Sequence, residues 1–226
     1  MVSTRSSSRP ADTPPIYLSS TKSQRTTTTN NTTTTKAAPA DAWHHAPSSF
    51  TLLWLAISLP LVIWDTVYIL CRPLTMEGGS MHWPLWVPYR LYGEVDHIYG
   101  WKAFHAHNGF SSAQGFLNAI ETTMYLAYLY MTYGQGAWKA GGRRGATAVL
   151  VGFSAAIMTL SKTVLYWANE YFSGFDNIGH NTWGDLILLW IIPNGAWLVG
   201  STGMIWTMGG NIIDGLTAAS GRSKRD

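Results

Sequence analysis

The chain has 226 residues, of which 46% are hydrophobic and only 12% are charged, about half of the roughly 25% that is usual in soluble domains. So few charges cannot cover the surface of an ordinary globular enzyme, so we exclude a soluble α/β enzyme and expect a membrane protein. The net charge of +3 comes largely from the chain ends and one short loop. It therefore indicates membrane topology and does not indicate a nucleic-acid partner.

Residues 1–48 form a polar stretch in which Ser, Thr, Pro and Ala dominate, with the run TTTTNNTTTTK at 26–36 as its extreme. Such a stretch buries too little apolar surface to offset the entropy of ordering it, so we expect a disordered tail. No apolar run precedes Phe50, so the tail does not read as a secretory signal. Its basic, acid-poor composition leaves a mitochondrial transit peptide open, although a cytosolic tail is favoured.

Four apolar stretches follow, and each reaches the length of about 20 residues that crosses a bilayer as a helix. The pattern predicts an all-α fold, a polytopic membrane four-helix bundle over residues 49–208, followed by a short basic tail at 209–226. The stretches cover residues 50–71, 111–133, 146–168 and 185–207.

The loops between these stretches differ in charge, which predicts their orientation. Residues 139–144 and the last five residues each hold three Lys or Arg side chains, whereas residues 169–184 hold none but contain Glu170 and Asp176. Basic loops stay on the cytosolic side. We therefore expect both termini in the cytosol and residues 72–110 and 169–184 on the far side.

The long far-side loop, residues 72–110, is rich in aromatic side chains. Amphipathic rings settle at the level of the lipid headgroups, and Pro84 and Pro88 argue against a regular helix. We interpret the loop as an interfacial cap over the bundle, with simple anchoring at the interface as the alternative. The rings are Trp83, Trp86, Tyr89, Tyr92, Tyr99 and Trp101.

Charged side chains occur inside the apolar stretches. Burying one near the bilayer centre costs about 2.5–3.5 kcal/mol, so such residues face the bundle interior and serve a purpose. Glu121 lies near the middle of the second stretch, and helical spacing places Asn118 and Tyr125 on its face. The other stretches hold comparable side chains at Asp65, Lys162, Tyr166, Trp190, Asn194 and Trp197.

Two interpretations of these polar residues compete. They can pair with one another to hold the helices together, as Lys162 would opposite Asp65 or Glu121. Alternatively, a carboxyl in a dry pocket can hold a proton near neutral pH and act in catalysis. We favour the structural role for Lys162 and the catalytic role for Glu121, because Asn118 and Tyr125 share its stripe.

Three segments, IETTMYLAYLY (120–130), KTVLYWANEYF (162–172) and PNGAWLV (193–199), resemble the emopamil-binding protein family, or EXPERA superfamily. Its branches include sterol double-bond isomerases and the sigma-2 receptor. The resemblance covers about residues 50–208. It implies a four-helix membrane module in the endoplasmic reticulum membrane.

The resemblance also implies roles for individual residues. Glu121 matches an acidic proton-handling residue, and Asn194 and Trp197 match an Asn-x-x-Trp pair that faces the reacting carbon and the cationic intermediate. The isomerases' His-x-x-x-Glu pair is missing from LPLVIWDTVY (59–68), where Asp65 is the nearby carboxyl, as in the sigma-2 branch. Two functions stay open: an isomerase or cyclase of a sterol-, terpenoid- or polyketide-derived substrate, and a non-catalytic sterol- or lipid-binding protein.

If the protein is an enzyme, we expect proton-initiated carbocation chemistry. Glu121 would give or relay the proton, Asp65 would be its partner, and Asn194 would orient one of them. Aromatic faces stabilise a desolvated cation by about 1–2 kcal/mol each, which suits Trp197, Trp190 and Tyr125. Asn118, Tyr166 and Lys162 would complete the substrate-binding wall.

The expected partners are a lipophilic substrate that enters from the bilayer and membrane lipids, with a homodimer left open. We expect no cofactor, because the sequence holds no GxGxxG, P-loop or HExxH motif. We also expect no metal: Cys71 is the single cysteine, and the far-side residues His97, His105 and His107 lack a ligand spacing. A purely structural membrane subunit is a third hypothesis.

Overall fold

The computed structural model describes residues 43–134, 136 and 139–223, so most of the predicted polar tail (1–42) lies outside the described residues. The last part of that tail is ordered, contrary to the prediction. Strand β1 (His44–His45) pairs antiparallel with β2 (Ala140–Gly141). His45 is buried, and Trp43 packs against the hydrophobic core, so this stretch has the contacts that the Ser/Thr-rich part lacks.

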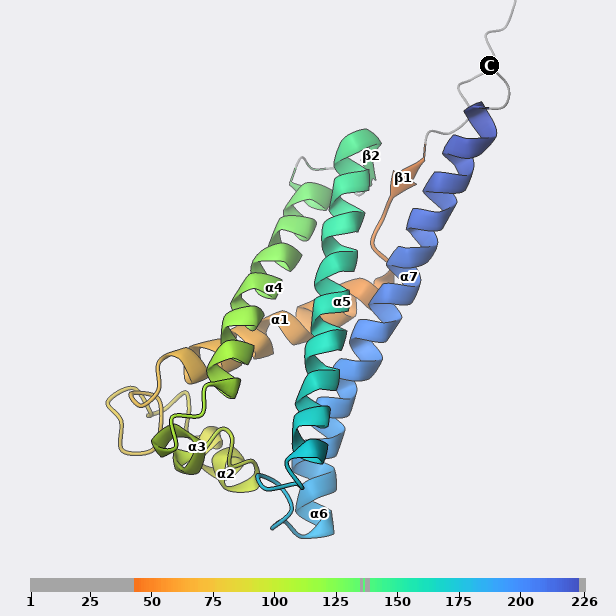
Figure 1. Ribbon diagram of the computed structural model, residues 1–226. Coiled ribbons are helices and arrows are strands. Elements are labelled where there is room, and N and C mark those ends of the chain that lie inside the picture. Colours follow the sequence, from red (N-terminus) through yellow and green to blue (C-terminus); the bar gives the residue numbers. More distant parts are fainter. Residues whose placement is uncertain (1–42, 135, 137–138, 224–226) are drawn as a thin grey trace, which may run out of the picture. The chain divides into compact units, whose positions relative to one another are not determined.

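Four long helices make up most of the described chain: α1 (Ser49–Leu70), α4 (Phe110–Tyr133), α5 (Gly142–Phe172) and α7 (Ile192–Ser223). Helix α5 packs against both α4 and α7, and α1 packs mainly against α4. Figure 1 shows α4 and α5 side by side, with α1 crossing them obliquely.

Among the described residues, three helices are long and apolar enough to cross a membrane: α1, α5 and the helical run Trp183–Gly221. The prediction of an all-α membrane protein is thereby confirmed. Helix α4 has a similar length, but polar side chains such as Gln114, Asn118 and Glu121 interrupt its apolar sequence.

The last helical run is composite and longer than predicted. It begins with α6 (Trp183–Asp185), continues through the π-helical turn η1 (Leu186–Ile191) and ends with α7 at Ser223. The glycine pair at 209–210 lies within α7. The apolar face continues on both sides of this pair, since Met208 belongs to the core and Ile212 packs against it.

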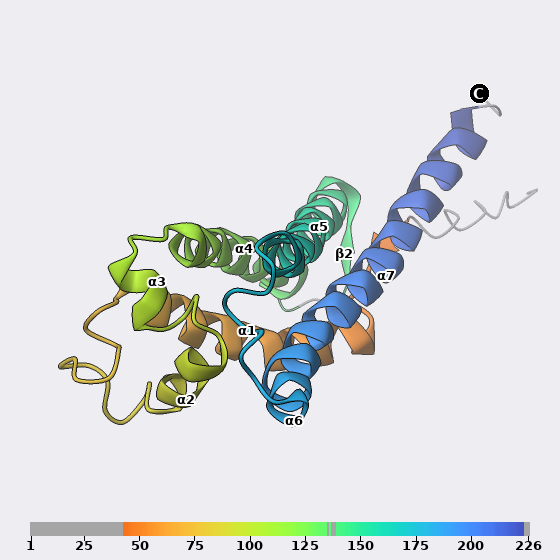
Figure 2. The ribbon, with the colours of Figure 1, turned by 60° about the horizontal axis from the view of Figure 1, so that its bottom comes forward.

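The segment between α1 and α4 lies at one end of the bundle, where α1 ends and α4 begins (Figure 2). It contains α2 (Pro88–Val95) and α3 (Trp101–His105), so the prediction that proline prevents a helix here was wrong for 88–95. Proline is tolerated at the first helical position, where its missing N–H has no intrahelical partner to lose. Tyr89 of α2 stacks on Tyr68 of α1, with ring centroids 3.8 Å apart, and fixes the cap to the bundle.

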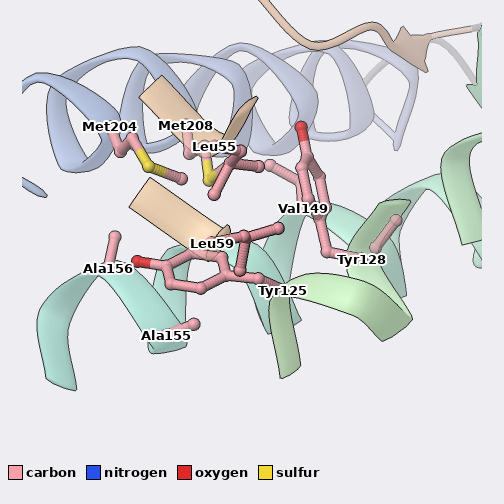
Figure 3. Close-up of a cluster of buried hydrophobic side chains, with 10 residues drawn as sticks. Leu55, Leu59, Tyr125, Tyr128, Val149, Ala155, Ala156, Met204 and Met208 are labelled. Atoms are coloured by element: carbon pink, nitrogen blue, oxygen red, sulfur yellow. The ribbon is translucent and has the colours of Figure 1, made fainter. Parts of the chain in front are cut away.

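The main hydrophobic core draws on all four long helices (Figure 3). Ala155 and Ala156 of α5 are fully buried, and their small side chains let the neighbouring helices approach closely. The core therefore holds the bundle together below the cap. Its other labelled members are Leu55, Leu59, Tyr125, Tyr128, Val149, Met204 and Met208.

Candidate active site

A cavity of about 450 Å³ lies among α1, α4, α5, α7 and the cap. This volume falls within the range of roughly 300–1,000 Å³ that is typical of small-molecule sites. Every predicted site residue except Trp190 lines the cavity. These residues are Asp65, Asn118, Glu121, Tyr125, Lys162, Tyr166, Asn194 and Trp197.

Glu121 on α4 and Lys162 on α5 form a buried ion pair. Lys162 Nζ lies 3.0 Å from Glu121 Oε2, and only 11% and 4% of the two side chains is exposed. Lys162 Nζ also donates a hydrogen bond to Asn118 Oδ1. The structure thus forms one of the two pairings that the sequence left open for Lys162.

The two oxygens of the Glu121 carboxyl group differ in their hydrogen bonding. Thr159 Oγ1 donates to Glu121 Oε2 at 2.9 Å, and the Tyr125 hydroxyl lies 3.1 Å from Thr159 Oγ1. Glu121 Oε1 is buried and has no hydrogen-bond partner within the described part of the chain. A buried acceptor without a partner is costly, so this oxygen is suited to contact a bound molecule.

Asp65 on α1 is held by neutral donors. The Tyr89 hydroxyl donates to Asp65 Oδ1 at 2.8 Å, and Asn118 Nδ2 donates to Asp65 Oδ2 at 3.1 Å. The Tyr99 hydroxyl adds a longer contact of 3.5 Å. Because the Asn118 amide also accepts from Lys162, it links the two carboxyl groups of the cavity through one continuous set of hydrogen bonds.

Asn194 and Trp197 approach the cavity from α7. Asn194 Nδ2 donates to the carbonyl oxygen of Trp190 at 2.9 Å, and the hydroxyl of Tyr92 in the cap interacts with the Asn194 side chain. Trp197 meets Trp54 of α1 edge to face, with ring centroids 5.2 Å apart, and both rings line the cavity. The indole wall expected from Trp197 is therefore built by two helices.

Trp190 lies behind the cavity wall instead of in it. Its Nε1 donates to Asp96 Oδ2 at 2.9 Å, and its ring stacks on Tyr166 with centroids 5.9 Å apart. The Tyr166 hydroxyl donates to the same carboxyl oxygen, and the Ile98 amide donates to Asp96 Oδ1 at 3.1 Å. The hydrogen bond to Asp96 fixes the Trp190 ring away from the cavity, which the sequence could not show.

Asp96, between α2 and α3, is a further buried carboxyl group. Its side chain is fully buried in the cap, and this burial raises its pKa to about 6, while its hydrogen-bond donors oppose the shift. Through Tyr166 and Trp190, Asp96 connects the cap to α5 and to η1, and so stabilises the part of the cavity wall that these elements form. Its position within an irregular loop gave no periodic signal in the sequence.

Several residues that line the cavity were not predicted as site residues, because most of them come from the irregular cap. Tyr89, Tyr92 and Tyr99 come from the cap, where we assigned them to the membrane interface, and Trp54 was not singled out. Thr159 carried a usable signal, because it lies three residues before Lys162 and therefore on the same helical face.

In the described ranges, no group of three or more His, Cys, Asp or Glu side chains is arranged to hold a metal ion. His97 instead stacks on His180, with centroids 3.9 Å apart and planes at 2°. His105 stacks on Trp101.

Comparison with known proteins gives no match: no family model, no curated protein and no solved structure matches the chain. The fold and the site define a helical membrane protein with a partly open, mainly apolar cavity that carries a few charged and polar side chains.

Proposed function

We propose that the protein is a membrane isomerase or cyclase that works by proton transfer without a soluble cofactor, and that it belongs with the EXPERA-type proteins that it resembles. One observation carries the proposal. Glu121 and Asp65, from different helices, face one cavity and are linked through Asn118 and Lys162. Buried acid and base groups that converge on a cavity are the usual means of proton transfer in an enzyme.

The chemistry starts at an alkene or epoxide of the substrate. In the alkene case, one carboxyl group gives its proton to a carbon, which forms a C–H bond and leaves a cation on the neighbouring carbon. The other carboxylate then removes a proton from a different carbon, and the electrons of that C–H bond form the new double bond. The faces of Trp54 and Trp197 stabilise the cation by about 1–2 kcal/mol each when water is excluded.

The charges of the cavity favour a neutral or cationic lipophilic substrate. Two carboxyl groups, Asp65 and Glu121, face the cavity, and one ammonium group, Lys162, faces them. An anionic substrate such as a diphosphate would find no free cation among the described residues of the cavity wall, because Lys162 is already paired with Glu121. We therefore infer a substrate of the sterol, terpenoid or polyketide class without a free anionic group.

The outer side of the cavity suits entry from the bilayer. Leu61 of α1 and Leu91 of α2 line the cavity and also expose 49% and 55% of their surface. In a membrane such side chains would contact lipid. A lipophilic molecule could therefore pass between them without crossing water.

We also propose that α4 is a fourth membrane crossing in the endoplasmic reticulum membrane, with both termini in the cytosol. Helix α4 packs against α1 and α5, its polar residues Asn118 and Glu121 line the cavity, and Phe116, Leu126 and Tyr130 are exposed on its other faces. This division explains how a helix of mixed composition can be stable in lipid.

The test is deletion of the gene followed by profiling of lipids and metabolites, with the variants restored on a plasmid. We expect a precursor to accumulate, the wild-type gene to clear it, and E121Q and D65N to fail. E170Q is the matched control, because Glu170 is equally buried near the end of α5 but does not line the cavity. Full clearance by E121Q at normal protein level would refute the proposal.

A second candidate is a non-catalytic sterol- or lipid-binding protein. Asp65 favours it, because this carboxyl contacts the cavity without an ion-pair partner in the described part of the chain and could bind the ammonium group of a ligand. The same deletion distinguishes the two candidates. A binding protein predicts an unchanged profile, together with saturable binding of a cationic amphiphile that D65N abolishes.

A further inference from the structure

The two carboxyl groups of the cavity have unequal electrostatic surroundings. Glu121 has an ammonium group 3.0 Å away, whereas every hydrogen bond that Asp65 accepts comes from a neutral hydroxyl or amide. Arg72, which follows α1, forms no ion pair with Asp65 in the described part of the chain, and its Nη2 donates to Ser111 Oγ at 2.6 Å. A cation in contact stabilises a carboxylate far more than neutral donors do.

From this asymmetry we propose that Lys162 keeps Glu121 in the charged form, so that Asp65 is the proton donor and Glu121 the proton acceptor. Lys162 and Asn118 are then positioning residues: Lys162 sets the charge of Glu121, and Asn118 holds both carboxyl groups at once. This assignment rests on the proposed proton-transfer function and specifies which carboxyl group performs each step.

The complete cycle balances with water as the only other reactant. Neutral Asp65 breaks its O–H bond and transfers the proton to a substrate carbon, which leaves a carboxylate and a substrate cation. Charged Glu121 then takes a proton from another carbon, and the C–H electrons form the new double bond. The unpartnered oxygen of Glu121, Oε1, is free for this second step because Oε2 is already occupied by Lys162 and Thr159.

The same asymmetry returns the site to its starting state. After one turnover the proton is on Glu121, next to the Lys162 ammonium, and Asp65 is charged. Glu121 then releases its proton to water and Asp65 takes up another from water, which restores the ion pair and neutralises the carboxyl group that no cation in the described ranges contacts. The return step is therefore downhill once product has left.

Infrared spectroscopy of the purified protein in lipid nanodiscs near neutral pH tests the assignment without any substrate, because a protonated carboxyl group has its own C=O stretching band. We expect D65N to remove a protonated-carboxyl band from the wild-type spectrum and E121Q to remove none. We expect K162M to gain a band that the double variant K162M/E121Q lacks. Loss of a protonated-carboxyl band in E121Q, or no such loss in D65N, would overturn the assignment.

K162R serves as the folding control, because it keeps the positive charge and should give the wild-type spectrum. If K162M does not fold, the comparison of wild type with D65N and E121Q still decides the assignment. The outcome is separate from that of the proposed function. A protein that converts no lipid can still show these bands, and an active enzyme with a protonated Glu121 would refute the assignment alone.

Discussion

Gly200 lies where α7 meets α1, and its replacement by alanine tests how tightly the indole wall of the cavity is built. An added Cβ would lie 2.2 Å from Trp54 Cε2, so the ring would have to retreat by about 1.2 Å to reach the 3.4 Å of ordinary contact. Overpacking of this kind costs about 1–3 kcal/mol. Because Trp54 also meets Trp197 edge to face, the displaced ring would distort the cavity wall.

Gly195 is the matched control on the same helix, because a Cβ there has no atom within 4 Å. Both substitutions gain up to about 1 kcal/mol of helix propensity, so G200A should be less stable than G195A by about 1–3 kcal/mol. The assay is unfolding of the purified proteins in one detergent, combined with precursor clearance in the deletion strain. G200A should lower both, whereas equal stability and equal clearance in the two variants would refute this account of the α1–α7 contact.

Three further predictions concern residues outside the cavity. Burial lowers the pKa of His45 below 6.5, so the folded protein should lose stability as the pH falls below 6.5, and H45Q should remove this acid sensitivity in unfolding measured against pH. Burial raises the pKa of Asp96 from 3.8 to about 6, so the folded state holds this proton more tightly than the unfolded state does. The stability that proton binding contributes should therefore be lost as the pH rises through about 6. D96N should flatten the dependence of the unfolding free energy on pH between 3.8 and about 6, and an unchanged slope would contradict the raised pKa of Asp96. Ser48 Oγ accepts the Thr51 amide at 3.0 Å at the start of α1, so S48A should cost about 1 kcal/mol, and S49A should cost less.

Much of the site could be predicted from the sequence because it lies on regular helices. Asn118, Glu121 and Tyr125 share one face at spacings of three and four residues, and the structure places all three on the cavity. Apolar length likewise predicted α1 and α5 as membrane-crossing helices. Such periodic signals depend on local geometry alone.

The parts that escaped prediction depend on contacts between distant segments. Tyr89 meets Asp65 only because the cap folds back over α1, and Trp190 turns to Asp96 across 94 positions of sequence. The sequence offered Lys162 either of two carboxyl partners, and helix packing selected Glu121. No periodic pattern encodes such a choice.

The central claim is that the carboxyl groups of this cavity transfer a proton to a lipophilic substrate. The most direct measurement uses membranes that contain the protein, incubated in D₂O with the precursor that accumulates in the deletion strain. The account predicts that wild-type membranes form a product carrying one deuterium on carbon, whereas E121Q membranes form none and E170Q membranes behave as wild type. A product without deuterium, or one formed at the wild-type rate by E121Q, would contradict it.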